Sequence, residues 1–172
     1  MSEQSGAEQS GTEQSGGAPA DAGRIVVGVD GSPSSQTALA WAVARSRETG
    51  QPVDAVIAWE FPPVYGIAPG SEFDFHGQAV EVLDKAVHDV VGIDDAGRVR
   101  QRVFRGHPAS VLLDAADGAD LLVVGCRGHG GFAGMLLGSV SQHVVAHASC
   151  PVVVLHEHGS PAPRGESAGA PV

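Results

Sequence analysis

The sequence predicts an α/β domain built on one five-stranded, doubly wound parallel sheet with helices on both faces. Five short apolar segments alternate with stretches of helical periodicity between residues 24 and 156. Such alternation is typical of parallel strands joined by right-handed helical crossovers. The first segment, residues 24–30, is a continuous β-branched run rather than an alternating one. A run of this kind indicates a strand that is covered on both faces.

Strong local signals delimit the first helix. Ser32 and Pro33 follow the first strand and suit the N-cap and the first helical position. The helix is expected to reach about Thr49, with Gly50 as its C-cap. The residues expected to face inward are Ala38, Leu39, Ala42 and Val43. A second strand is predicted over residues 53–59.

The remaining elements follow in the same alternation. An irregular loop is expected to last until about His76, and a helix over residues 77–91 follows it. Residues 98–103 alternate charged and less polar side chains, which indicates a half-exposed edge strand. The last predicted elements are a helix over 108–117, a strand over 119–125, a helix over 138–148 and a strand over 151–155.

Both ends of the chain are predicted to be disordered. Residues 2–16 repeat a five-residue pattern (SEQSG, AEQSG, TEQSG), and the C-terminal stretch is small, polar and rich in Pro and Gly. Such segments bury too little apolar surface to offset the entropy lost on ordering. We therefore assign residues 1–23 and 157–172 as tails and residues 24–156 as one domain. The domain carries 14 acidic and 9 basic side chains, so about half of the chain's net charge of −10 lies in the tails.

Charge and hydropathy argue against several classes of partner. A net charge of −10 disfavours nucleic acid and anionic membranes. No stretch approaches the ~20 apolar residues of a membrane-spanning helix, and the opening MSEQSG lacks the features of a secretory signal. A cytoplasmic location is therefore expected. Cys126 and Cys150 are expected to be small buried thiols without a disulfide.

A glycine-rich loop, GCRGHGGFAGMLLGSVS, joins the fourth strand to the last helix. Gly125 and Gly128 would let backbone N–H groups converge as an anion-binding nest. Gly138 would begin a helix whose positive dipole end faces the same place. Ser139 and Ser141 add hydroxyl groups for phosphate or for a phosphate-bound metal ion. The alternative is a surface loop followed by a Ser-capped helix.

Two standard nucleotide motifs do not account for this loop. A P-loop requires Gly-Lys-Ser/Thr, and the only lysine of the chain is Lys85. Gly128 to Ala133 fits a loose G-x-G-x-x-A pattern, but it follows the fourth strand rather than the first. We therefore discount a nicotinamide dinucleotide site.

The glycine loop contains the pattern G-x2-G-x9-G-S, which runs from Gly125 to Ser139. Several other segments of the chain accompany this pattern. They are IVVGVDGS at 25–32, AWE at 58–60, HPAS at 107–110, ADLLVVG at 119–125 and SCPVVV at 149–154. Together these segments resemble the universal stress protein family, and the glycine pattern is similar to the nucleotide-binding signature of that family. The similarity covers essentially the whole predicted domain.

The resemblance implies a sheet order of 3-2-1-4-5, ATP bound with Mg²⁺ where the strand order reverses, and homodimers paired through residues 151–155. It also implies site residues. Asp30, with Gly28 and Val29, would meet the adenosine, and Ala58 would line the adenine pocket. The expected contacts to ribose and phosphates are Gly125, Arg127, Gly128, Gly138, Ser139, Val140 and Ser141. Asp30 suits a ribose hydroxyl better than a phosphate, and a helix-entry cap is its alternative role.

The function expected from these residues is a dimeric, nucleotide-dependent regulatory module in stress response. A slow ATPase or phosphotransferase using the same loop is the alternative. Residues 125–141 contain no Asp or Glu to serve as a base or metal ligand, so binding is favoured and no catalytic residue is assigned.

Histidines supply no clear metal site. His143 and His147 lie four residues apart on the last predicted helix, a spacing that suits zinc, but no third ligand is evident. An ordinary helical surface is therefore favoured. Whether His129, in the glycine loop, contacts phosphate is left open.

Overall fold

A computed structural model describes residues 23–60, 74–128 and 136–157. Its five strands form one parallel sheet in the order β3-β2-β1-β4-β5, as expected. The strands are β1 (Ile25–Gly28), β2 (Val53–Trp59), β3 (Val99–Arg105), β4 (Leu121–Gly125) and β5 (Val152–Leu155). Because β3 and β5 are the outermost strands, neither has a second neighbouring strand within the described residues.

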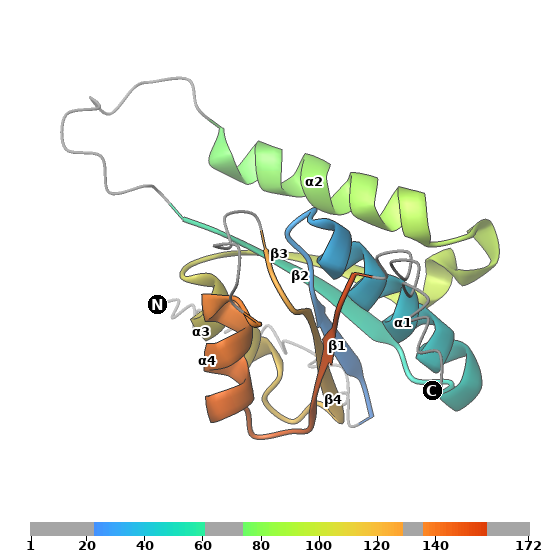
Figure 1. The fold of residues 1–172 in the computed structure, drawn as a ribbon. Helices are drawn as coiled ribbons and strands as arrows, with labels where there is room; N and C mark the ends of the chain where they lie inside the picture. Colours follow the sequence, from blue (N-terminus) through green and yellow to red (C-terminus); the bar gives the residue numbers. More distant parts are fainter. Residues whose placement is uncertain (1–22, 61–73, 129–135, 158–172) are drawn as a thin grey trace, which may run out of the picture.

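Two pairs of helices cover the sheet (Figure 1). The helices are α1 (Pro33–Thr49), α2 (Phe75–Val90), α3 (Pro108–Ala115) and α4 (Ser139–His147). Leu39 of α1 and Leu83 of α2 pack against one face, whereas Leu112 of α3 and Val144 of α4 pack against the other. Within β1, Val27 faces the first pair of helices and Val26 faces the second. This two-sided burial explains the continuous apolar run of the first strand.

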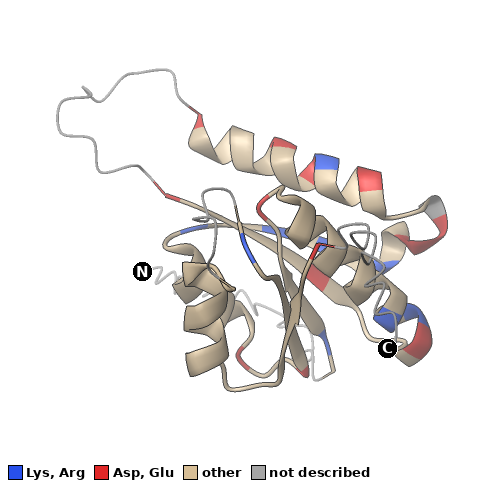
Figure 2. Ribbon diagram, in the orientation of Figure 1, with Lys and Arg blue, Asp and Glu red and all other residues tan. Residues whose placement is uncertain are grey.

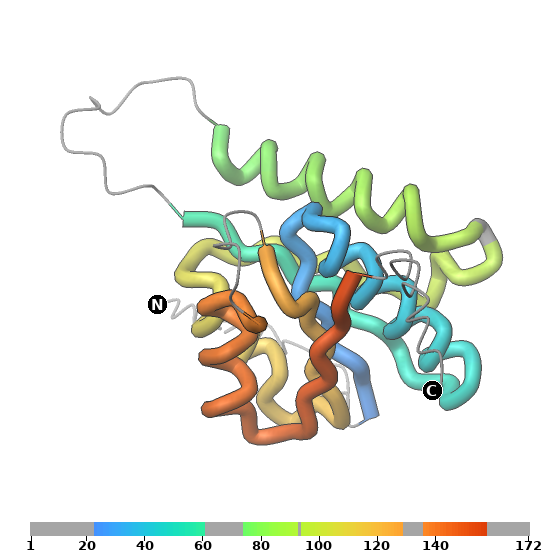
Figure 3. The backbone as a smooth tube through the Cα atoms, viewed as in Figure 1, coloured from blue at the N-terminus to red at the C-terminus, as the bar shows by residue number. Residues whose placement is uncertain are grey.

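The strand order reverses at the central strand β1: β2 and β3 lie on one side of it, and β4 and β5 lie on the other. β1 pairs with β2 on one side and with β4 on the other, although β4 follows it by more than 90 residues (Figure 3). The crossover through α1 leads to one side of β1, and the crossover through α3 leads to the other. A cleft forms at the carboxyl ends of strands at such a reversal.

Local caps set several of the observed boundaries. Ser32 accepts a hydrogen bond from the Ser35 N–H, and Gly50 adopts φ 76° while its N–H donates to the Ser46 carbonyl, so both predicted ends of α1 are confirmed. By contrast, α2 begins at Phe75 and not at residue 77. The Asp74 carboxylate accepts from the Gly77 N–H at 2.8 Å and so caps the helix earlier.

Other boundaries also differ from the predictions. β1 ends at Gly28, although the Val29 N–H still donates to the Val56 carbonyl. A 3-10 helix, η1 (Ile93–Arg98), precedes β3 and was not predicted. Residues 1–22 and 158–172 of the predicted tails, most of the loop after β2, and His129 lie outside the described residues. Within the described ranges, no helix combines the length and the apolar character that crossing a membrane requires.

Candidate functional site

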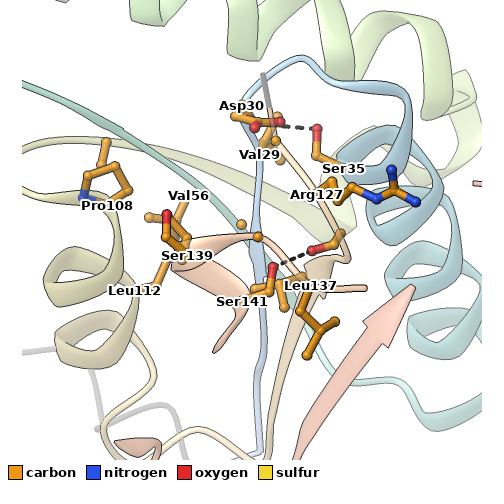
Figure 4. Close-up of a pocket in the computed structure, with 17 residues that line it drawn as sticks. Val29, Asp30, Ser35, Val56, Pro108, Leu112, Arg127, Leu137, Ser139 and Ser141 are labelled. Carbon is orange, nitrogen blue, oxygen red and sulfur yellow. Dashed lines mark hydrogen bonds between the residues drawn. The ribbon is translucent and has the colours of Figure 1, made fainter. Parts of the chain in front are cut away.

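A cavity of about 550 Å³ opens at the carboxyl ends of β1 and β4, where the strand order reverses. Cavities that bind cofactors and small molecules commonly have this size and this position. Its walls come from β1, β2, β4, the first turns of α1 and α3, and the first turn of α4. Figure 4 shows these elements converging on one space.

The structure brings all the predicted site residues to this one cavity. The eleven predicted lining residues are Gly28, Val29, Asp30, Ala58, Gly125, Arg127, Gly128, Gly138, Ser139, Val140 and Ser141. Six more line it that the sequence did not identify: Ser35, Val56, Pro108, Leu112, Val124 and Leu137. Val56 and Ala58 share one face of β2, so strand alternation alone could have added Val56.

One wall of the cavity is apolar. It is formed by Val56 and Ala58 of β2 and by Pro108 and Leu112 of α3, and Figure 4 shows Pro108, Val56 and Leu112 on the same side. Gly28 lets Leu112 of α3 pack close to β1, because a Cβ at this position would lie 2.9 Å from Leu112 Cδ1. The wall suits a flat, largely apolar ring such as a nucleobase.

Asp30 sits at the rim of the cavity and is exposed. Its Oδ1 accepts hydrogen bonds from the Ser32 N–H at 3.0 Å and from Ser32 Oγ at 2.6 Å. The Asp30 N–H in turn donates to Ser35 Oγ at 3.4 Å (Figure 4). The carboxylate therefore braces the N-cap of α1, the alternative role weighed for it, while its Oδ2 faces Gly128.

The described glycines of the loop allow close packing of neighbouring backbone, and none of them adopts a left-handed conformation. The αR–αL form of a nest has a residue with positive φ, and none of Gly125, Gly128 and Gly138 has one. A Cβ on Gly125 would lie 2.7 Å from the backbone of Ser34, so glycine lets β4 touch the first turn of α1. An αR–αL nest is thus not found within the described part of the loop.

The N-terminus of α4 supplies donors to the cavity, although not all of the expected ones. The Gly138 N–H donates to the Cys126 carbonyl at 2.7 Å, and Ser141 Oγ donates to the Gly125 carbonyl at 2.7 Å (Figure 4). These two groups hold the loop against the helix. The following N–H groups begin α4, and no side-chain hydrogen bond caps this end. An uncapped helix N-terminus attracts anions.

Few charged groups surround these donors. Figure 2 shows no Lys, Arg, Asp or Glu on α4. Among the lining residues within the described ranges, Arg127 is the only cation and Asp30 the only acid. No group of three His, Cys, Asp or Glu side chains suited to a metal ion occurs in the described part of the chain. The lining can hold an anion, but it offers little for acid–base chemistry.

The remaining predicted side chains lie outside this cavity or take no part in it. The rings of His143 and His147 stack with centroids 4.3 Å apart on the exposed face of α4. Cys126 is buried as expected, Cys150 is only partly buried, and both thiols are free.

Comparison with known proteins identifies the family. The family model described as "Universal stress protein family" matches residues 22–156. The chain belongs to the universal stress protein family. A universal stress protein from Mycolicibacterium smegmatis is 36% identical over 138 residues, which cover 76% of this chain and 45% of that protein. The chain spans about half the length of the curated relatives it matches.

Solved universal stress proteins share the architecture. One, described as a universal stress protein in complex with cAMP, is 27% identical with a TM-score of 0.55; the match covers 78% of this chain and 96% of that one. The hypothetical protein MJ0577 matches with a TM-score of 0.66 at 20% identity, covering 82% of this chain and 100% of that one, and shows the fold alone.

Proposed function

We propose that this universal stress protein binds ATP with Mg²⁺ in the β1–β4 cavity and acts as a dimeric, nucleotide-dependent regulatory module in stress response. The observation that carries the proposal is the convergence of all eleven predicted residues on one cavity that also receives the uncapped N-terminus of α4. The solved universal stress protein described in complex with cAMP supports a nucleotide as the class of ligand.

The shape of the cavity suggests how the nucleotide would lie. Its base would contact the apolar wall formed by β2 and α3, and its ribose would lie near Asp30. The phosphates would then meet the first N–H groups of α4 and the guanidinium of Arg127. The exposed Ser139 hydroxyl is available to a Mg²⁺ ion that the phosphates carry.

Binding without rapid hydrolysis fits this lining better than the alternative, a slow ATPase or phosphotransferase. Phosphoryl transfer needs a group to orient the nucleophile and usually carboxylates for the metal ion. Among the described residues, Asp30 is the only carboxylate that lines the cavity, and it is hydrogen-bonded to Ser32. Sustained phosphate release that Gly138→Asp abolishes would instead support the enzyme.

Gly138→Asp tests the binding proposal. A Cβ at this position would lie 3.5 Å from Arg127 Cα and 3.6 Å from the Cys126 carbonyl oxygen, which are ordinary contacts. The fold should therefore tolerate the change, whereas the new carboxylate would repel phosphates. We expect the ATP affinity, measured by calorimetry with Mg²⁺, to fall about 30-fold or more, which corresponds to roughly 2 kcal/mol.

Gly138→Ala is the matched control and should keep both stability and most of the affinity. Gly128→Asp is a poorer test, because its side chain would also collide with the Asp30 carboxylate. If millimolar ATP with Mg²⁺ neither raises the melting temperature of the wild-type protein nor gives heat of binding, the proposal fails. The cytoplasmic location and the homodimer stay predictions from the sequence.

A further inference from the structure

A second cavity, of about 460 Å³, lies between α3 and β3. It is on the same side of the sheet as α3 but shares no lining residue with the β1–β4 cavity. Its lining includes Arg24, Asp54, Arg102, Phe104, Val111 and Asp114. We call it the arginine cavity, because guanidinium groups dominate its charge.

A buried carboxylate holds the guanidinium groups in place. The side chain of Asp54 is 4% exposed, and its oxygens lie 2.7 Å from Arg100 Nε, 3.1 Å from Arg102 Nε and 3.7 Å from Arg24 Nε. Arg24 also donates to the carbonyls of Ala115 and Asp117 at the end of α3. The arginines are therefore oriented before any ligand arrives, which lowers the entropy cost of binding.

Positive charge is concentrated here in an otherwise acidic protein. The chain has a net charge of −10 and nine arginines. Four of them lie in or beside the arginine cavity: Arg24, Arg100, Arg102 and Arg105. The carboxylates in its lining are those of Asp54 and Asp114. An anion would thus find a locally favourable field here, although the net charge of the whole molecule repels anions at long range.

Apolar side chains line part of the arginine cavity beside the charged groups. Phe104 points from the edge strand β3 and is 40% exposed, and Val111 of α3 lines the same space. Guanidinium groups match the oxygens of phosphate and hold a dianion well. We propose that the arginine cavity is a second binding site, specific for a small phosphomonoester that carries an apolar group.

Residue-resolved NMR titration of the full chain with phenyl phosphate and with inorganic phosphate tests this proposal. We expect saturable amide shifts in β3 and α3 for both probes, with tighter binding of phenyl phosphate. Arg102→Gln should weaken both probes about tenfold, because it removes a charge-assisted contact. Phe104→Ser should weaken only phenyl phosphate.

Arg45→Gln is the control, since Arg45 is a similarly exposed arginine that pairs with Glu48 on α1, away from the cavity. It should leave both affinities unchanged. Absence of saturation in β3 and α3, or equal losses in Arg102→Gln and Arg45→Gln, would overturn the proposal. Binding of the probes that appears only after residues 1–22 are removed would also overturn the proposal. In that case the acidic segment, and not a phosphomonoester, would occupy the arginine cavity. Shifts around Gly138 report the β1–β4 cavity separately.

Discussion

Ser34 is a single side chain on which the shape of the β1–β4 cavity depends. It is fully buried, its hydroxyl donates to the Arg127 carbonyl, and its backbone touches Gly125. Ser34→Ala removes the donor without adding bulk. We expect the free energy of unfolding to fall by about 1 kcal/mol and ATP affinity to fall about tenfold, because the start of the glycine loop loses its anchor.

Ser46→Ala provides a matched control for this prediction. Ser46 is also fully buried, and its hydroxyl donates to the Gln51 carbonyl at 2.5 Å, at the other end of α1. Denaturant unfolding should show a similar loss of stability, and calorimetry should show unchanged ATP affinity. An affinity loss of equal size in the two variants would mean that Ser34 contributes only to stability.

The sequence predicted which residues lie at the site better than it predicted the role of each. Gly125 and Ser141 were expected to serve phosphate directly, yet Gly125 permits contact with α1 and Ser141 donates to the Gly125 carbonyl. The sequence identified which positions meet, because their spacing follows the strand-to-helix turn. It could not show which carbonyl each hydroxyl donates to, since that depends on contacts between α1 and the loop.

At the scale of elements, β5 bears on the predicted dimer. The carbonyls of Pro151 and Leu155 accept hydrogen bonds from the N–H groups of Leu122 and Cys126, at 3.0 and 2.7 Å. Because backbone groups alternate in direction along a strand, Val153 also faces β4. Val152 and Val154 then direct their N–H groups outward, toward any partner strand.

Val154→Pro should therefore weaken the dimer selectively. It removes an outward donor at the edge, where proline is tolerated, and we expect dissociation to increase on the order of 100-fold, equivalent to ~3 kcal/mol. Sedimentation equilibrium measures the dimer, and circular dichroism checks the fold. Val153→Pro should instead disrupt pairing with β4 and lower the melting temperature. A Val154→Pro protein that stays dimeric would exclude pairing through β5.

Elements with local signals were predictable, and those held by distant contacts were not. Ser32 and Gly50 delimit α1 from within the sequence around them. In contrast, η1 is fastened by Asp95, which pairs with Arg47 of α1 and with Arg98. The Arg47 guanidinium holds the pKa of the Asp95 carboxyl below its ordinary value. No sequence pattern within residues 93–98 indicates a partner on α1, so η1 was not predicted.

At the scale of the whole molecule, the fold class could be predicted because alternating strands and helices leave few topologies, and the strand order was implied by the resemblance to the universal stress protein family. The arginine cavity could not be predicted from the sequence. Arg24 precedes β1, Arg102 lies on β3 and Asp54 on β2, so these residues meet only once the strands are in register. Asp54 pairs with Arg100 across β2 and β3, which the alternating charges of the edge strand did not reveal.

The uncapped end of α4 has a consequence for the kinetics of binding. Phosphate would be held there mainly by backbone N–H groups, while the chain as a whole carries a net charge of −10. ATP should then be repelled at long range and attracted only at contact. Added salt screens the long-range repulsion first. Stopped-flow measurements should therefore show association becoming faster as ionic strength rises, the opposite of a site that draws its ligand in with lysines.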